Sequence, residues 1–228
     1  MREISLDTET TGLSVTNGDR ITEIGCVEII DKRVTGKFFH SYVNPEKEVS
    51  KEAEKISGLT YDFLKSHPKF KEICDEFLNF IKDSRLVIHN ASFDIEFLNM
   101  ELKEAGTEVL KNDRVVDTLA IARQKYPGSP STLDALCKKF SINASKRIKH
   151  GALIDAELLA EVYIVMSVEK RQKDIFSSVN YSYDYSNSIN RNKELQFKLI
   201  QVSDDELSLH NEFLKKIKNS IWENINKC

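Results

Sequence analysis

Residues 4–9 of the chain read ISLDTE, an alternation of apolar and polar side chains that is typical of a half-buried β-strand. The apolar residues fall on one face of this strand, and Asp7 and Glu9 fall on the other. The segment TTG at residues 10–12 then has turn chemistry. The pattern therefore predicts an early strand that ends with two neighbouring carboxylates on the same face.

Similar patterns predict the other elements of an α/β domain. Strands are expected at residues 21–30 and 36–43, joined by a polar turn at 31–33, and at 85–88 and 115–116. Helices are expected within 51–82, most clearly over 70–81, then from Asn90 or Ser92 onward, over 118–125 and 132–139, and from just after Gly151 to about Met166. Either Asn90 or Ser92 is suited to cap the helix that follows the fourth strand.

The composition is that of a globular domain. The chain has 228 residues, of which 40% are hydrophobic and 30% are charged, enough for one α/β domain and an appendage. No stretch approaches the roughly 18 apolar residues of a membrane span, and no apolar signal region follows Met1, so we expect a cytoplasmic protein. Four cysteines without metal-ligand or redox spacing indicate reduced thiols.

The formal net charge is −3, whereas proteins that bind nucleic acid on their own usually carry a basic excess. The charge therefore indicates either that the chain does not hold long duplex by itself or that a partner delivers its substrate.

The amino-acid composition changes near the C-terminus. Residues 177–192 are rich in Ser, Asn, Tyr and Asp and have no apolar period, as in a linker. Apolar residues return from about Glu194, and an amphipathic helix is expected to open at Ser203-Asp204. The predicted organisation is a domain over 1–170, a linker over 171–192 and a tail over 193–228.

Several acidic residues are candidates for chemistry, and each has an ordinary alternative. Asp7 and Glu9 could simply form a solvent-exposed strand face. Asp94, at a strand-to-helix junction, could simply be a first-turn residue that interacts favourably with the helix dipole. Asp155 shares a helical stripe with Leu159, Val162 and Met166, so it faces the core, where a carboxylate needs a partner or a metal. Asp155 could also be a helix-start residue.

His150 precedes Asp155 by five residues. On a continuous helix, side chains at this spacing point in different directions. The two side chains converge only if His150 lies on the preceding loop, where Gly151 makes a bend easy. An imidazole in such a place can act as a general base. Four carboxylates and one base suit phosphodiester hydrolysis with two divalent ions about 4 Å apart. Hard oxygen ligands favour Mg²⁺ or Mn²⁺ over zinc.

Three segments, in order, resemble the exonuclease motifs of the histidine-type DEDD superfamily: DTETTG at 7–12, NASFD at 90–94 and HGALIDA at 150–156. Three more are similar to the epsilon-type proofreading subunits of bacterial DNA polymerase III: VIHNA at 87–91, STLDALC at 131–137 and SKR at 145–147. The resemblance covers about residues 1–168. It implies an RNase H-like fold, a mixed five-stranded sheet flanked by helices, and 3′→5′ removal of mismatched nucleotides from single-stranded or frayed DNA ends.

The same resemblance implies roles for individual residues. Asp7, Glu9 and Asp155 would hold the ion that activates water, Asp7 would bridge to a second ion supported by Asp94, and His150 would be the general base. For the substrate it implies contacts from Thr10, Asn90 and the position of Ser57. Ser57 stands where relatives commonly carry His, which puts contacts to the terminal nucleotide in doubt.

Two C-terminal segments resemble partner-binding regions. Gln172, Ile175 and Phe176 lie in a segment similar to the short peptide that docks on the bacterial sliding clamp, although it could equally be a helix end. The tail lies where epsilon subunits bind the polymerase subunit, and its candidate anchors are Phe213, Ile217 and Trp222. Tethering to a polymerase would make a large basic footprint unnecessary.

Two other functions remain open from the sequence. An exoribonuclease could use the same carboxylates, because contacts at the 2′-OH separate RNA from DNA. A catalytically inactive adaptor between clamp and polymerase is a further alternative, against which the five intact site residues argue.

Overall fold

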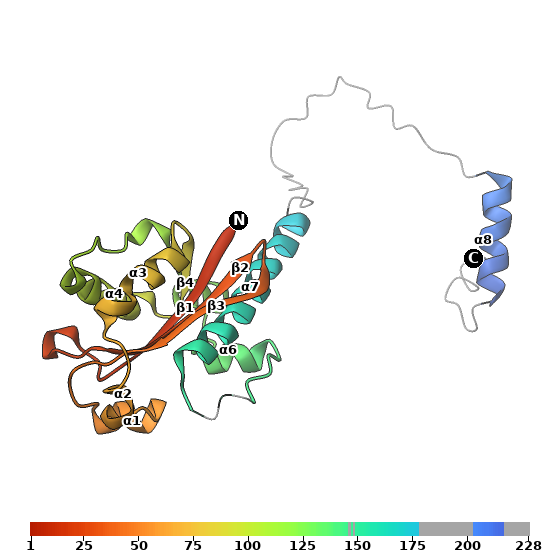
Figure 1. Ribbon diagram of the computed structural model, residues 1–228. Helices are drawn as coiled ribbons and strands as arrows, with labels where there is room; N and C mark the ends of the chain where they lie inside the picture. The colour runs from red at the N-terminus through yellow and green to blue at the C-terminus, as the bar shows by residue number, and fades with distance from the viewer. Residues whose placement is uncertain (146, 148, 178–202, 217–228) are drawn as a thin grey trace, which may run out of the picture. The chain divides into compact units, whose positions relative to one another are not determined.

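The computed structural model describes residues 1–145, 147, 149–177 and 203–216 (Figure 1). The chain consists of two units, residues 1–181 and 182–228, which we describe separately. Among the described residues, no helix is both long enough and apolar enough to cross a membrane.

The first unit is built on one mixed five-stranded sheet with the order β3-β2-β1-β4-β5. The strands are β1 (Arg2–Thr10), β2 (Ile21–Ile30), β3 (Arg33–Tyr42), β4 (Arg85–Ile88) and β5 (Val115–Asp117). β1, β2 and β3 pair antiparallel, whereas β4 pairs parallel with β1 and with β5. The predicted α/β fold with a five-stranded sheet is confirmed.

β2 and β3 form the predicted hairpin, but β3 begins earlier than the pattern indicated. Asp31 and Lys32 form a two-residue turn in which both residues have positive φ, 49° and 62°. β3 then starts at Arg33, and Gly36 (φ 85°) lies inside the strand instead of marking its start. A glycine within a strand can accommodate a bulge, and the register shifts here between Val27 and Ile29.

The described part of the first unit also contains the helices α1 (Lys51–Ser57), α2 (Tyr61–Leu64), α3 (Phe70–Ile81), α4 (Ala91–Ala105), α5 (Thr118–Lys125), α6 (Leu133–Lys139) and α7 (Ala152–Ser177). Short 3₁₀ turns lie at Val15–Asn17 and Asn112–Arg114. The helix expected to end near Met166 continues to Ser177, because residues 168–173 contain good helix formers and neither Gly nor Pro.

The helices cover the two faces of the sheet (Figure 1). α3 and α4 pack on the face that carries Ile4 and Leu6, where they bury Phe77 and Phe97. α6 and α7 cover the opposite face, the one that carries Asp7 and Glu9, and form a second apolar cluster.

The stripe predicted on α7 faces this second cluster. Asp155 is 3% exposed, and Leu159, Val162 and Met166 are buried. The carboxylate of Asp155 is therefore held on the core-facing side of its helix, as the spacing predicted.

Three cysteines of the described residues, Cys26, Cys74 and Cys137, are free and buried. Burial raises the pKa of each thiol, so all three remain protonated and poorly reactive. This agrees with the expectation of reduced thiols.

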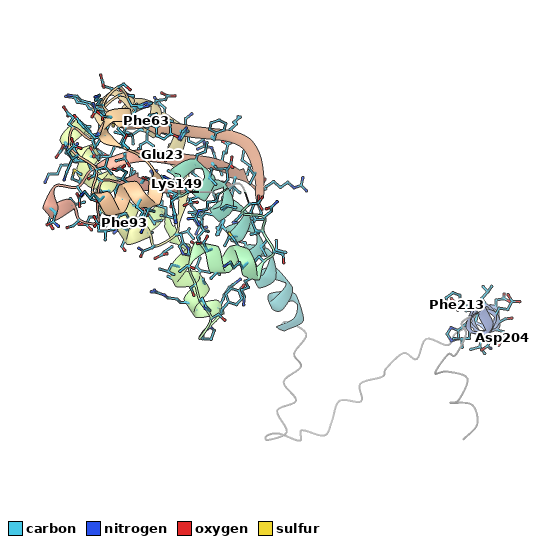
Figure 2. All side chains as sticks on the ribbon, turned by 90° about the horizontal axis from the view of Figure 1, so that it is seen from below. Glu23, Phe63, Phe93, Lys149, Asp204 and Phe213 are labelled. Atoms are coloured by element: carbon cyan, nitrogen blue, oxygen red, sulfur yellow. The ribbon has the colours of Figure 1, made fainter. Side chains whose placement is uncertain are left out.

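The described part of the second unit is helix α8 (Asp204–Lys216). Ser203 and Glu206 form a reciprocal cap: the Ser203 hydroxyl accepts from the Glu206 N–H, and the Glu206 carboxylate accepts from the Ser203 N–H. The predicted helix start is confirmed. Leu207, Leu209 and Phe213 are more than half exposed, and Phe213 is labelled in Figure 2.

Candidate active site

The C-terminal end of β1 presents two carboxylates that lack donors. Asp7 and Glu9 are partly buried, and no hydrogen-bond donor of the described residues reaches either side chain. Glu23 on β2 lies directly opposite Glu9 in the antiparallel ladder and is itself buried. His40 lies 2.8 Å from the Glu23 carboxylate. Negative charge is thus concentrated at this end of the sheet.

Asp94 joins this group from the first turn of α4. β4 pairs with β1 only from Glu3 to Ser5, so the later part of β1 is open on that side. The Asp94 carboxylate accepts hydrogen bonds there from the Thr8 N–H at 3.0 Å and the Thr8 hydroxyl at 2.7 Å. Asp94 is 3% exposed, so these bonds hold a buried carboxylate against Thr8, the residue between Asp7 and Glu9 in the sequence.

Asp155 and His150 reach the same place from the start of α7. The helix begins at Ala152, so His150 lies on the preceding loop, as convergence requires. The His150 Nδ1 lies 3.3 Å from Asp155 Oδ2. Ligand atoms of Glu9, His150 and Asp155 all lie within 4.8 Å of one another.

Gly25 permits this approach. It lies opposite Asp7 in the β1–β2 ladder, so its missing side chain would point to the same face of the sheet. A Cβ at this position would lie 2.3 Å from the backbone of Ala152 and of Leu153. The first turn of α7 therefore rests directly on the backbone of β2. This role of Gly25 was not predicted from the sequence, although a glycine inside a strand pattern is a signal of close backbone approach.

These residues line one open cleft of about 780 Å³, a volume in the range of small-molecule sites. Its lining includes Asp7, Glu9, Asp94, His150 and Asp155, together with Thr8, His89, Asn90, Phe93, Leu119, Arg123, Ser129, Ser131, Thr132, Leu133, Asp134 and Arg147. Figure 2 shows the side chains of this unit, with Phe93, Glu23 and Lys149 labelled. The structure thus brings together all five of the predicted catalytic and metal-binding residues.

The three residues predicted to contact substrate are placed differently. Asn90 lines the cleft, but Thr10 and Ser57 are not among the lining residues. The Thr10 hydroxyl donates to the Gly12 carbonyl at 2.5 Å, and the Ser57 hydroxyl donates to the Ala53 carbonyl at 3.0 Å.

Asn90 occupies the N-cap position of α4, one of the two expected places, but the expected capping by its side chain is not made. Asn90 has φ 67° and makes no side-chain cap, and Ser92 lies inside the helix. Instead, the Asn90 N–H donates to the Asp117 carboxylate at 3.2 Å. The left-handed conformation, which Asn tolerates, turns the chain from β4 into α4.

The carboxylates perturb one another strongly. Burial, followed by the charges of Asp94, Asp155 and Glu9, raises the pKa of Asp7 well above its ordinary value. Burial and the Asp155 and Glu23 charges raise the pKa of Glu9 to about 8.

The other two carboxylates are shifted in the same direction. Burial raises the pKa of Asp94 to about 7, against the opposing effect of the Thr8 hydrogen bonds. Burial also raises the pKa of Asp155, although Arg147 and His150 lower it. A cluster of this kind is short of positive charge.

Arg147 supplies part of that charge. Arg147 lies in a basic stretch of the sequence, with Lys146 and Lys149 close by, yet its side chain is only 8% exposed. Its Nη2 donates to Asp155 Oδ2 at 2.7 Å and to His150 Nδ1 at 2.6 Å, and its Nη1 pairs with Asp134.

The residues of the cleft fit a divalent cation. The buried Oδ1 of Asp155 has no hydrogen-bond partner, and the carboxylates of Asp7 and Glu9 have no donors. Oxygen ligands of this kind suit hard cations. A bound cation would also offset the burial and the mutual repulsion that raise their pKa values.

The predicted partner-binding residues are largely beyond what the structure describes. Gln172, Ile175 and Phe176 belong to the last turns of α7, but their side chains lie outside the described part. Ile217 and Trp222 lie outside it entirely, and Phe213 is 62% exposed on α8.

Comparison with known proteins identifies the family. The exonuclease family model matches residues 4–163. The DNA polymerase III subunit epsilon of Rickettsia felis is 46% identical over 222 residues, which cover 95% of this chain and 97% of the relative.

Two solved structures are similar in fold. Exonuclease X in complex with 5′ overhanging duplex DNA has a TM-score of 0.56 and 25% identity, with coverage of 75% of this chain and 92% of that chain. The nuclease domain of 3′hExo, a DEDDh family member bound to rAMP, has a TM-score of 0.64 and 17% identity, with coverage of 74% and 92%. These neighbours confirm the RNase H-like fold.

Since the family model spans most of the chain and an epsilon subunit matches nearly all of it, the chain belongs to the exonuclease family, among the epsilon subunits of bacterial DNA polymerase III, and is a metal-dependent 3′→5′ exonuclease.

Proposed function

We propose that this chain removes mismatched nucleotides from the 3′ end of DNA in the cytoplasm, as the proofreading partner of a replicative polymerase, with two divalent cations, Mg²⁺ or Mn²⁺. The observation that supports this most directly is the convergence of Asp7, Glu9, Asp94, Asp155 and His150 on one cleft. They come from β1, α4 and the start of α7.

In this proposal the carboxylates hold the cations. Asp7, Glu9 and Asp155 would hold the first, and Asp7 and Asp94 would serve the second. Bound there, the cations would supply the positive charge that activates water and stabilises the leaving oxygen. The Thr8 hydrogen bonds keep the Asp94 carboxylate oriented toward the cleft.

His150 is the proposed general base. Its side chain is 47% exposed, so the imidazole can reach a water molecule and return the proton to solvent. Asp155 lies beside Nδ1 and can stabilise the imidazolium that forms. Of the residues proposed to contact the substrate, Asn90 lines the cleft. Thr10 and Ser57 do not line it, so the terminal nucleotide would have to extend beyond the cleft to contact them.

A primer-degradation assay tests the activity and its specificity. Full-length protein with Mg²⁺ should shorten a 3′-mismatched DNA primer faster than a matched one, and chelator should stop the reaction. Asp7→Ala should abolish it. Equal activity in the Asp7→Ala protein would indicate a contaminating nuclease or a non-catalytic chain. Preference for an RNA oligonucleotide of the same length would favour an exoribonuclease instead.

The tail is the proposed contact with the polymerase subunit. The Rickettsia felis relative is named as a subunit of DNA polymerase III, and its similarity covers 95% of this chain. On α8 the exposed side chains Leu207 and Phe213 are available to a partner, and Ile217 and Trp222 would continue the contact beyond the described residues. A chain truncated at about residue 185 should keep nuclease activity and fail to co-purify with the polymerase subunit. Retained co-purification would contradict this.

The segment with Gln172, Ile175 and Phe176 is a proposed contact with the sliding clamp. A peptide spanning residues 169–180 should bind the clamp, and a Gln172→Ala, Phe176→Ala peptide should not. Equal binding by the two peptides, or none by either, would remove the clamp from the list of partners.

A further inference from the structure

The positively charged guanidinium of Arg147 contacts two of the residues that could hold a metal ion, Asp155 and His150. Its guanidinium contacts Asp155 and His150 through one nitrogen, and it reaches Asp134 through another. Since guanidinium groups only donate, the His150 Nδ1 must accept this bond with its lone pair. Arg147 therefore forms hydrogen bonds with both a proposed metal ligand, Asp155, and the proposed general base, His150.

The guanidinium also balances charge beyond its direct contacts. It lowers the pKa of Asp7, Glu9 and Asp155, in opposition to the burial and mutual repulsion that raise them. A divalent cation at the same place would have the same effect with twice the charge.

The contact with Asp155 is incomplete, however. Arg147 Nε lies 2.5 Å from Asp155 Oδ1, yet both atoms are buried and neither has a hydrogen-bond partner. Arg147 thus provides charge to this oxygen without a properly directed hydrogen bond. Such an oxygen remains available to a ligand that binds without directional demands, as a metal ion does.

We propose that Arg147 is the resident counter-ion of the site: it competes with the divalent cation for Asp155, and binding of the cation releases both Asp155 and the Nδ1 of His150. This inference rests on the proposed function in that the carboxylates must bind cations. The alternative is a purely structural ion pair, which would stay in place whether or not a cation is bound. The two differ in how removal of Arg147 affects metal affinity.

Titration with Mn²⁺, followed by the electron paramagnetic resonance signal of the free ion, measures that affinity without reference to activity. Arg147→Gln in the full chain should bind Mn²⁺ about tenfold more tightly than the unmodified protein, since a competing charge is gone. Arg123→Gln is the matched control. Arg123 lines the same cleft and carries the same charge, but within the described residues it has no ion pair with the carboxylates, so its removal should leave the affinity nearly unchanged.

Thermal unfolding in chelator and in saturating Mn²⁺ separates the two interpretations. Arg147→Gln should lower the Tm in chelator, where Asp7, Glu9 and Asp155 lose their counter-charge, and this deficit should shrink in Mn²⁺. A structural ion pair would give the same deficit in both conditions. Arg147→Lys keeps the charge on one nitrogen that cannot hold Asp155, His150 and Asp134 together. It should fold, and it should bind Mn²⁺ more tightly than the unmodified protein by a smaller factor.

Failure of the unmodified protein to bind Mn²⁺ would overturn the proposed metal site. Binding by the unmodified protein with equal or weaker binding by both Arg147 variants would overturn the role of Arg147 alone.

Discussion

Replacing Gly25 by alanine should disable the site while leaving each proposed ligand and the general base in the sequence. The added Cβ would lie 2.3 Å from the backbone of Ala152 and Leu153, whereas ordinary contacts begin near 3.4 Å. Backbone atoms cannot rotate away, so the start of α7 must move from β2 by about 1 Å. That movement carries Asp155 and His150 away from the carboxylates of β1.

A misplacement of this size costs about 100-fold in rate when reacting groups depend on alignment. We therefore expect the single-turnover rate of Gly25→Ala to fall by about that factor at saturating Mg²⁺, with a loss of about 1–3 kcal/mol in the free energy of unfolding from overpacking. The rate is measured with a 5′-labelled single-stranded DNA primer, and the free energy by urea denaturation.

Gly106→Ala provides a control for instability. Gly106 has φ 80° at the end of α4 and nothing within 4 Å of an added Cβ, so alanine there costs stability through backbone strain alone. Its hydrolysis rate should remain normal. If Gly25→Ala folds and hydrolyses DNA as fast as Gly106→Ala, the close approach of α7 to β2 does not position the site, and the reasoning fails.

Three further outcomes are expected. Thr8→Val removes the 2.7 Å hydrogen bond to Asp94 and should raise the Mg²⁺ concentration for half-maximal rate about tenfold, measured by metal titration of hydrolysis; an unchanged value would contradict it. Because burial and neighbouring carboxylates raise the pKa of Glu9 from 4.5 to about 8, the folded chain holds a proton that the unfolded chain lacks between these values. In chelator the free energy of unfolding should therefore fall as pH rises from 4.5 to 8, and less so in Glu9→Gln; equal pH profiles would refute this. Tyr163→Phe deletes the hydroxyl that donates to buried Glu3 at 2.6 Å, and it should lower the free energy of unfolding by about 1–3 kcal/mol in urea denaturation. The hydrolysis rate should not change, and a slower rate would contradict this expectation.

The sequence was informative wherever one local pattern determined the structure. The strands at 21–30 and 85–88 and the helix at 70–81 have the predicted bounds, because their apolar periodicity is clear. The burial of Asp155 followed from its place in an apolar helical stripe. The convergence of residues far apart in the chain was not readable from spacing and depended on the resemblance of three short motifs.

Features that depend on tertiary contact were missed. The left-handed conformation of Asn90 serves the turn from β4 into α4 and the hydrogen bond to Asp117, and no local pattern distinguishes it from an ordinary cap. Arg147 looked like part of a basic loop, and only the folded chain shows that it is buried against Asp155. Gly25 looked like one residue of an apolar strand, yet its missing side chain determines how closely α7 can approach.

The most direct test is anomalous diffraction from crystals of the full chain grown with Mn²⁺. Two anomalous peaks should lie in the cleft, one within coordination distance of Asp7, Glu9 and Asp155 and the other near Asp7 and Asp94. Both should be absent from Asp7→Asn crystals grown in the same way. Full Mn²⁺ occupancy elsewhere with none among these four carboxylates would contradict the assignment of the cleft as the hydrolytic site.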